Sequence, residues 1–167
     1  MRQSLAIARQ PLDVAEMIPL HAAGRDPLFF FGTLMDTDVL TYVLGRPIDL
    51  DDLEPAVLTG FRRVRTRDAT YPVLVDAPGE TVEGRMLRKA TRRDIVRINH
   101  YESEEYRAER HPVRCGRGID HGAWLYMALD ALVASEDPWH LDHWAHHHKP
   151  TYFDACDGWM EGCPEIG

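Results

Sequence analysis

A chain of 167 residues and 19.1 kDa has the length of one domain, and 44% hydrophobic with 28% charged residues is a globular composition, not a disordered or fibrous one. Asp and Glu (27) outnumber Lys and Arg (19), and the net charge of −8 argues against nucleic acid or an anionic membrane as a partner. The three cysteines are too few for a disulfide framework, no apolar run would span a bilayer, and residues 1–26 lack a signal-peptide core. We therefore expect a cytoplasmic single-domain protein.

The N-terminal part of the chain divides at Pro27. Residues 1–26 are predicted to be an extension and residues 27–167 the domain itself, with a helical C-terminal tail. Leu28–Phe31 is a short, fully apolar run that is typical of a buried strand. Asp36–Leu44 then predicts a short helix that begins with an N-cap aspartate, and Gly45 is a suitable residue to end it.

Three β-like segments occupy the middle of the chain. Ala56–Thr66 is rich in β-branched residues and predicts a strand. Tyr71–Val75 predicts a second strand, and residues 76–79 (Asp-Ala-Pro-Gly) have the composition of a turn. Thr81–Leu87 would then be the returning arm of a hairpin.

A change of period marks a helix over Thr91–Tyr101. Thr91 and Asp94 have the spacing of a capping box, with Asp in place of the usual Glu or Gln. Ile95, Ile98 and Tyr101 lie on one face of that helix.

Two more strands and two short helices are predicted in the C-terminal part. Tyr106–Cys115 and Ala123–Leu129 have strand character, while helices are expected to begin near Asp137 and after Pro150. Strands outnumber helices and do not alternate regularly with them. The pattern therefore favours the α+β class over a doubly wound α/β fold.

The first candidate site combines a Gly-Thr turn with a glutamate. Gly32 and Thr33 follow a predicted buried strand, where free backbone N–H groups can bind a carboxylate or an oxyanion. Glu102 stands beside Tyr101 at the end of a predicted helix, and an aromatic pocket would raise its pKa toward that of a general base. The alternatives are an ordinary turn and a solvated glutamate in an acidic run.

The tail offers a second candidate site because it is rich in histidine. His143 and His147 are four residues apart, as zinc ligands on a helix are, but Trp144 stands where the glutamate of that motif is expected. We therefore predict no metal site. Large apolar residues at near-helical spacing, such as Tyr152 and Trp159, predict instead a structural tail that covers the barrel or packs on a second copy.

A third candidate is a series of arginines. Arg63, Arg65 and Arg67 alternate along a predicted strand and would share one side of it, with Arg62 on the other. They could bind an acidic substrate. We favour a solvated sheet face whose arginines pair with carboxylates.

Taken together, short blocks in a fixed order resemble the γ-glutamylcyclotransferase-like family. The blocks are Phe29-Phe30-Phe31-Gly32-Thr33-Leu34, Tyr71-Pro72-Val73-Leu74-Val75, Val82-Glu83-Gly84-Arg85-Met86-Leu87, Ile98-Asn99-His100-Tyr101-Glu102-Ser103 with Tyr106, and Ala123-Trp124-Leu125-Tyr126. The resemblance covers residues 28 to 128. It implies a small mixed β-barrel with flanking helices.

The resemblance also assigns roles to residues. It implies that Glu102 is the catalytic acid and base. The substrate-binding residues that it implies are Phe31, Gly32, Thr33, Leu34, Pro72 and Tyr126. Phe31 departs from the family pattern, which has tyrosine at that position, so the hydroxyl that tyrosine would bring is missing here.

The implied reaction is cyclisation of a γ-glutamyl amine or peptide. The α-amine of the glutamyl unit attacks its own γ-carbonyl carbon, which gives 5-oxoproline and releases the amine, with no metal or organic cofactor. The expected partner is a small γ-glutamyl molecule, and the apolar tail leaves room for a homodimer. The alternative is a non-catalytic module on the same fold that binds a small ligand or a partner.

Overall fold

The structure, a computed structural model, describes residues 10–102, 105–116, 118–129 and 134–166. The strands of this part are β1 (Asp13–Ala15), β2 (Leu28–Phe30), β3 (Leu53–Thr66), β4 (Pro72–Leu87), β5 (Tyr106–Cys115), β6 (Asp120–Ala128) and β7 (Ala134–Pro138). Its α-helices are α1 (Thr37–Leu44), α2 (Arg92–Glu102), α3 (Leu141–His147) and α4 (Lys149–Met160). Residues 1–9 of the predicted extension lie outside the described part, as do Ser103 and Glu104.

Five strands close into a barrel. Their order is β5-β6-β2-β4-β3, and β3 pairs back to β5 to complete the ring. The pair β2–β6 is parallel and the other pairs are antiparallel, so the barrel is mixed, as predicted. Strand β1 extends the sheet beyond β5, and β7 extends it beyond β3. The α+β class is confirmed.

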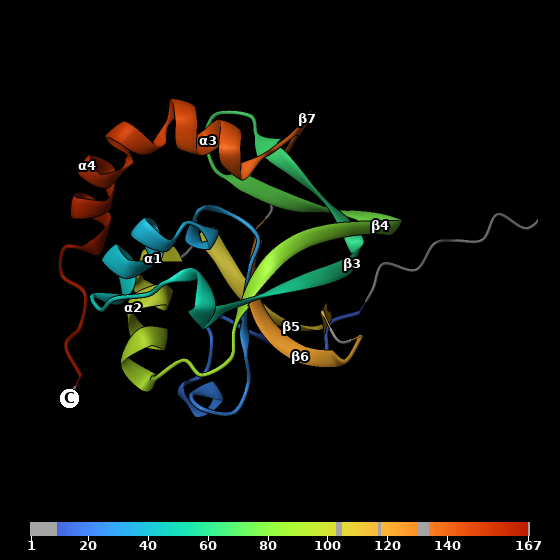
Figure 1. Cartoon of the computed structure of the whole chain (residues 1–167), viewed down its shortest axis with the longest axis horizontal. Helices are drawn as coiled ribbons and strands as arrows, with labels where there is room; N and C mark the ends of the chain where they lie inside the picture. The colour runs from blue at the N-terminus through green and yellow to red at the C-terminus, as the bar shows by residue number, and fades with distance from the viewer. Residues whose placement is uncertain (1–9, 103–104, 117, 130–133, 167) are drawn as a thin grey trace, which may run out of the picture.

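Two hydrophobic layers hold the fold together. The barrel interior is filled by side chains such as Phe29, Phe61 and Leu125. A second layer lies between the barrel and the helices and includes Ile98 of α2 and Trp144 of α3. Figure 1 shows α1, α2 and α4 gathered on one side of the barrel, with α3 leading from β7 into α4. The helices therefore cover one flank of the barrel.

The predicted caps at Asp36 and Gly45 and the capping box of Thr91 and Asp94 are confirmed. The Asp36 carboxylate accepts hydrogen bonds from the amides of Asp38 and Val39 (3.0 and 3.1 Å), and Gly45 has a φ of 67° after α1. At the start of α2, the Thr91 amide donates to the Asp94 carboxylate and the Asp94 amide to the Thr91 hydroxyl (2.9 and 3.0 Å). Both ends depend on side chains a few residues away, which explains why sequence alone found them.

The predicted hairpin between Tyr71–Val75 and Thr81–Leu87 is wrong, because both segments belong to the single strand β4. Residues 77–80 bulge out of β4 opposite Gly60 of β3, and pairing with β3 resumes on either side. Gly79 has a φ of 83°, as in a turn. The turn residues produce a bulge and not a reversal because β3 continues alongside; the chain reverses between β3 and β4 instead.

The predicted start of the first tail helix is also wrong. Residues 134–138 form β7, and α3 begins only at Leu141. Pro138 pairs with Val64 at the edge of the sheet, where the missing N–H of a proline is tolerated. The second tail helix begins at Lys149, two residues before the predicted start, and Pro150 lies in its first turn.

The arginine series does not form one solvated face. Arg65 and Arg67 are exposed, and Arg67 lies beyond the end of β3. Arg63 is half-buried and donates to three backbone carbonyls, those of Phe31 (2.9 Å), Glu83 (2.9 Å) and Trp139 (3.2 Å). Arg63 therefore joins three segments of the chain. Its guanidinium supplies a hydrogen-bond donor to carbonyl groups whose burial without a partner would be unfavourable.

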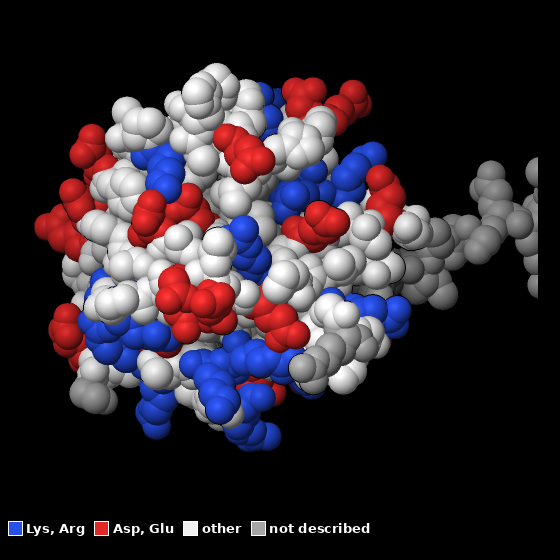
Figure 2. All heavy atoms as spheres, in the orientation of Figure 1, with Lys and Arg blue, Asp and Glu red and all other residues white. Residues whose placement is uncertain are grey.

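Acidic and basic side chains are interspersed over the face of the molecule seen in Figure 2. Ion pairs between described residues include Arg88 with Glu54 and Arg110 with Asp13 (both 2.5 Å). None of the helices in the described ranges has the length and apolar character needed to cross a membrane.

Candidate active site

A cavity of about 400 Å³ lies where the end of β2 meets the start of β4, the end of α2 and the helix α4. All of the residues predicted for the site line this one cavity: Phe31, Gly32, Thr33, Leu34, Pro72, Glu102 and Tyr126. The chain supplies them from β4, β6, α2 and the loop after β2. The fold therefore brings together residues that are up to 95 positions apart in the sequence, from Phe31 to Tyr126.

The loop after β2 lines the cavity, and three of its backbone amides have no partner among the described residues. Within the described residues, the amides of Gly32, Thr33 and Leu34 donate to no other group, because the bonded amides of this short 3-10 turn begin at Met35. A Cβ on Gly32 would lie 3.1 Å from the Pro72 ring, so glycine permits the close approach of the two segments. Arg63 fixes the loop through the Phe31 carbonyl.

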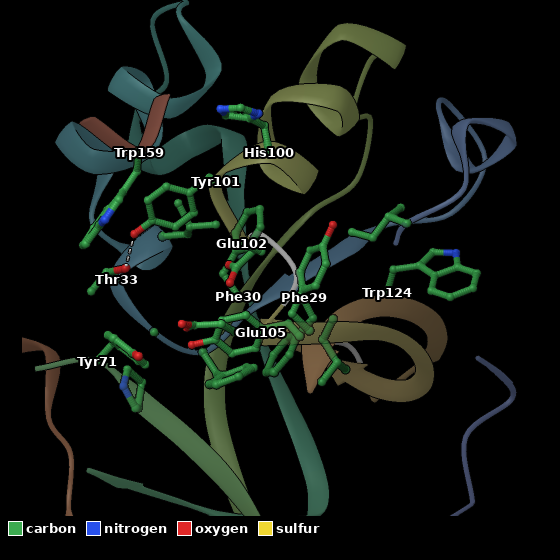
Figure 3. A pocket seen from close by; sticks show the side chains of 18 of the residues that line it. Phe29, Phe30, Thr33, Tyr71, His100, Tyr101, Glu102, Glu105, Trp124 and Trp159 are labelled. Atoms are coloured by element: carbon green, nitrogen blue, oxygen red, sulfur yellow. Dashed lines mark hydrogen bonds between the residues drawn. The ribbon is translucent and has the colours of Figure 1, made fainter. Parts of the chain in front are cut away.

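Glu102 is the last residue of α2, and its carboxyl group points into the cavity (Figure 3). Burial raises its pKa to about 8, from an ordinary value of 4.5. No Lys, Arg or His side chain in the described part of the chain pairs with it. A carboxyl group in this setting can hold or release a proton near neutral pH.

Tyrosine hydroxyls surround Glu102. Burial is the main cause that raises the pKa of each of these tyrosines, and the nearby Glu102 charge raises it further. They are Tyr71, Tyr101, Tyr106, Tyr126 and Tyr152. Because their pKa values are raised, all five stay protonated at neutral pH and can donate a hydrogen bond to a ligand.

Two groups of these tyrosines face each other across the cavity. On the helical side, the Thr33 hydroxyl bonds to those of Tyr101 (2.9 Å) and Tyr152 (3.3 Å). On the barrel side, the ring of Tyr106 lies edge-on to those of Tyr71 and Tyr126, with centroids 6.5 Å apart in both pairs. Figure 3 shows Glu102 between Tyr101 above and Tyr71 below.

One hydroxyl on the barrel side has spare bonding capacity. The Tyr126 hydroxyl is buried and faces the backbone of Ile18, but it makes no hydrogen bond of normal geometry within the described residues. Burying an unpaired hydroxyl is unfavourable. A ligand group or a water molecule that bonded this hydroxyl would therefore gain affinity.

None of the described tail histidines lines this cavity. Their rings contact one another instead. The rings of His143 and His147 are 4.2 Å apart between centroids, on one face of α3. Across residues 10–102, 105–116, 118–129 and 134–166, no three His, Cys, Asp or Glu side chains gather as metal ligands do.

A family model described as gamma-glutamyl cyclotransferase, AIG2-like, matches residues 28–146. That range is more than half of the chain and contains every residue predicted for the site. The chain belongs to this family. The match reaches further than the blocks that carried the resemblance, because it also includes β7 and most of α3.

Curated members of the γ-glutamyl cyclotransferase, AIG2-like family from Arabidopsis thaliana are similar to the chain over most of its length. AIG2-like protein C is 27% identical over 140 residues, which are 80% of this chain and 77% of the relative. AIG2-like protein B is 24% identical over 139 residues, with the same two coverages. Both names describe a family and not a reaction.

Solved structures share the family fold. A solution structure of an Arabidopsis thaliana protein aligns with a TM-score of 0.58 at 22% identity, covering 85% of this chain and 95% of that one. The crystal structure of YkqA from Bacillus subtilis aligns with a TM-score of 0.55 at 19% identity, covering 84% of this chain and 56% of that one. These likenesses establish the fold.

Sequence reasoning missed part of the cavity of this family member. Tyr71 and Tyr106 were only parts of predicted strands, although both lie within or beside the blocks that carried the resemblance. Tyr152 and Trp159 were predicted as structural residues of the tail, yet both line the cavity. No local signal distinguishes them, since apolar helical spacing is the same for a residue that covers a core and one that lines a pocket.

Proposed function

We propose that the protein is an enzyme that cyclises a γ-glutamyl amine or peptide to 5-oxoproline and releases the amine. The single observation that carries the proposal is the cavity that Glu102, with a pKa of about 8, shares with the loop after β2, whose amides have no partner among the described residues. Membership of the family supports it. The residues proposed to bind substrate are Phe31, Gly32, Thr33, Leu34, Pro72 and Tyr126.

Proton transfer is the proposed task of Glu102. The α-amine of a γ-glutamyl unit is an ammonium group at neutral pH and cannot act as a nucleophile. The adjacent α-carboxylate keeps the pKa of this amine above the ~8 of a peptide N-terminus, so the raised pKa of Glu102, about 8, makes the proton transfer less uphill than it would be to an ordinary carboxylate. The ionised Glu102 takes this proton, and the free amine then attacks the γ-carbonyl carbon.

The remaining steps close the ring and break the amide bond. A new bond forms between the α-nitrogen and the γ-carbon, and the electron pair of the carbonyl moves onto its oxygen. Glu102 then delivers its proton to the departing nitrogen as the old bond between carbon and nitrogen breaks and the electron pair on oxygen re-forms the carbonyl. The ring nitrogen loses its one extra proton, which the released amine takes up to become an ammonium ion. Because nucleophile and electrophile belong to one molecule, the protein contributes mainly the folded-back conformation and the proton transfers.

Backbone and hydroxyl donors are proposed to hold the substrate. The free amides of Gly32, Thr33 and Leu34 suit a carboxylate or the developing oxyanion. The protonated tyrosines add neutral donors on both sides of Glu102. Donors that are already fixed in place need no reorganisation when charge develops, which is where their catalytic advantage lies.

The test is Glu102→Gln, assayed by the 5-oxoproline formed from a panel of γ-glutamyl compounds. Gln keeps the volume but cannot carry the proton, so kcat should fall by about 10²–10⁴-fold. Binding of a γ-glutamyl compound, measured by calorimetry, should persist. In the wild type, kcat/KM should rise with pH and level off above about pH 8, because the ionised Glu102 is the base.

The matched control is Glu105→Gln, since Glu105 also lines the cavity but is exposed to solvent. In Glu105→Gln, kcat should fall less than about tenfold, whereas Glu102→Gln should lose the full contribution of general acid–base catalysis. Wild-type turnover by Glu102→Gln would refute the mechanism. If the wild type turned over no γ-glutamyl compound but bound one, the protein would be a non-catalytic binding module on this fold.

A further inference from the structure

Arg63 of β3 contacts the loop after β2 from outside the cavity. Its guanidinium group donates to the Phe31 carbonyl at 2.9 Å. The described lining of the cavity includes Phe31 and Gly32 but not Arg63, which lines a separate hollow along β3 and β4. The peptide group that joins Phe31 to Gly32 therefore belongs to the cavity wall and has Arg63 on its carbonyl side.

The direction of the Phe31 carbonyl also sets the direction of the next N–H. A trans peptide group is planar, and its C=O and N–H point to opposite sides. The peptide bonds of the described residues are all trans. Because the Phe31 carbonyl points at Arg63, the Gly32 N–H points away from Arg63. This N–H is one of the three loop amides without a partner in the described part of the chain.

The other two of these amides are oriented by the loop itself. The carbonyl groups of Gly32 and Thr33 each accept a hydrogen bond at 3.0 Å from the amide three residues further on, in the 3-10 turn. These bonds fix the two peptide groups whose N–H groups belong to Thr33 and Leu34. The Phe31 carbonyl precedes the turn, and the hydrogen bond that fixes it comes from Arg63.

Arg63 is itself held by two other segments. Its guanidinium donates to the carbonyl groups of Glu83 in β4 (2.9 Å) and of Trp139 before α3 (3.2 Å). It also lies over the Trp139 ring, 5.5 Å from the ring centroid. Because a planar guanidinium that makes all of these contacts has little freedom to turn, it binds the Phe31 carbonyl from a fixed position.

Arg63 also places a positive charge behind the loop. Among the residues that the structure describes, no Lys or Arg lines the cavity, and none of the ion pairs includes Arg63. A cation bound to the carbonyl polarises the whole peptide group, which makes the N–H at its other end a stronger donor. The Gly32 N–H therefore suits an anionic acceptor.

We propose that Arg63 is a positioning residue of the active site: it holds the peptide between Phe31 and Gly32 so that the Gly32 N–H points into the cavity and binds the α-carboxylate of the γ-glutamyl unit. This inference rests on the proposed function. The α-carboxylate keeps its charge throughout the reaction, so this contact stabilises the bound substrate and the transition state equally. Loss of Arg63 should therefore weaken binding and leave the chemical step largely unchanged.

Two ligands that differ in one charge test the inference by binding. 5-Oxoproline carries the carboxylate of the γ-glutamyl unit, and 5-oxoprolinamide carries a neutral amide in its place. In the wild type, calorimetry should give a Kd at least tenfold lower for 5-oxoproline. In Arg63→Met, which keeps an unbranched side chain without its donors or its charge, the two Kd values should agree within threefold. Arg63→Lys, which keeps the charge, should restore part of the difference.

Kinetics provide a second measurement. On the γ-glutamyl compound that the wild type turns over best, Arg63→Met should raise KM at least tenfold and lower kcat less than threefold, as expected for the loss of uniform binding. The matched control is Arg65→Met, an exposed arginine two positions further along β3. It should leave kcat, KM and both Kd values unchanged.

NMR of the wild type tests the same contact without any substitution, should Arg63→Met fail to fold. Addition of 5-oxoproline should shift the Gly32 amide proton downfield, and 5-oxoprolinamide should shift it less. Equal shifts, or no shift with either ligand, would overturn the inference.

The remaining outcomes separate the inference from the proposed function. A ratio of the two Kd values that is the same in Arg63→Met as in the wild type would overturn the inference, and so would a wild type that binds both ligands equally or neither of them. The proposed function would stand in each case, because turnover is measured separately. If the wild type formed 5-oxoproline from no γ-glutamyl compound, the proposed function would fail, whereas the Kd ratio would still decide whether Arg63 prepares the Gly32 amide for a carboxylate.

Discussion

A carboxyl group among aromatic rings is harder to ionise than one in water, and Glu102 is such a group. Its neighbours Tyr101 and Tyr106 are close in the chain, but the rings of Tyr126 and Tyr152 come from β6 and α4. Burial by all of these elements raises the pKa of Glu102 to about 8. The sequence predicted the direction from the Tyr-Glu step, whereas the other rings could be placed only by the fold.

The raised pKa makes a prediction about stability that is independent of any activity. A carboxyl group whose pKa is raised on folding contributes stability that is fully present below its ordinary pKa of 4.5 and is lost as the pH rises through 8. Glu102→Gln cannot ionise and escapes this loss. Its free energy of unfolding should therefore exceed that of the wild type increasingly between pH 5 and pH 9.

Each unit of pKa shift corresponds to about 1.4 kcal/mol, so the gain at high pH should be at least about 2 kcal/mol. Urea denaturation at several pH values measures it. Glu136→Gln, at an exposed position of β7, is the control and should follow the wild-type curve. If the Glu102→Gln and wild-type curves are parallel over this range, the carboxyl group is not desolvated.

Among the elements, the tail departs most from its prediction. It was expected to cover one end of the barrel or to contact a second copy, and within the chain it does pack on the helices. Trp144 of α3 is fully buried, and its ring lies edge-on to Tyr152 with centroids 4.9 Å apart. Cys156 of α4 is also fully buried. The same helix then lines the cavity, so one element serves both the core and the site.

Two tail tryptophans test which part of the tail belongs to the core and which part lines the cavity. Trp144→Ala should lower the free energy of unfolding by about 3–5 kcal/mol, because it empties a buried site. Trp159→Ala removes a side chain that is 46% exposed and should change it by less than about 1 kcal/mol. Chemical denaturation measures both. Similar losses for the two variants would mean that α3 is not part of the core or that Trp159 is.

At the scale of the whole molecule, the barrel depends on a close approach of β2 and β4. Phe30 of β2 pairs with Arg85 of β4, next to Gly84. A Cβ on Gly84 would lie 2.4 Å from the Phe30 carbonyl oxygen and 2.5 Å from the Phe29 ring. Phe29 fills the barrel interior, so neither neighbour can move without opening the barrel.

Gly84→Ala should therefore destabilise the protein by about 1–3 kcal/mol, the usual effect of overpacking a core. Gly158→Ala is the matched control, because its added Cβ would meet nothing within 4 Å on α4. That variant should be neutral or up to about 1 kcal/mol more stable, since alanine favours a helix over glycine. Thermal or urea unfolding measures the stability of both variants. Equal stabilities would contradict the close approach of β2 and β4 at Gly84.

The sequence by itself determined what depends on neighbours along the chain. The caps at Asp36 and at Thr91 with Asp94 were predictable because their hydrogen bonds span three residues or fewer. The strand of Tyr106–Cys115 was predicted with its observed bounds. The short blocks were enough to indicate the family and the α+β barrel, because those residues specify local backbone shape as well as the cavity.

Only the tertiary structure decided the features that depend on distant partners. Residues 77–80 form a bulge and not a hairpin turn because β3 pairs with β4 on both sides of them. Arg63 binds carbonyls from three segments that no pattern along β3 reveals. Tyr152 reaches Thr33 across 119 positions. Local propensities act over a few residues, whereas these contacts exist only after the barrel has closed and α4 has packed beside it.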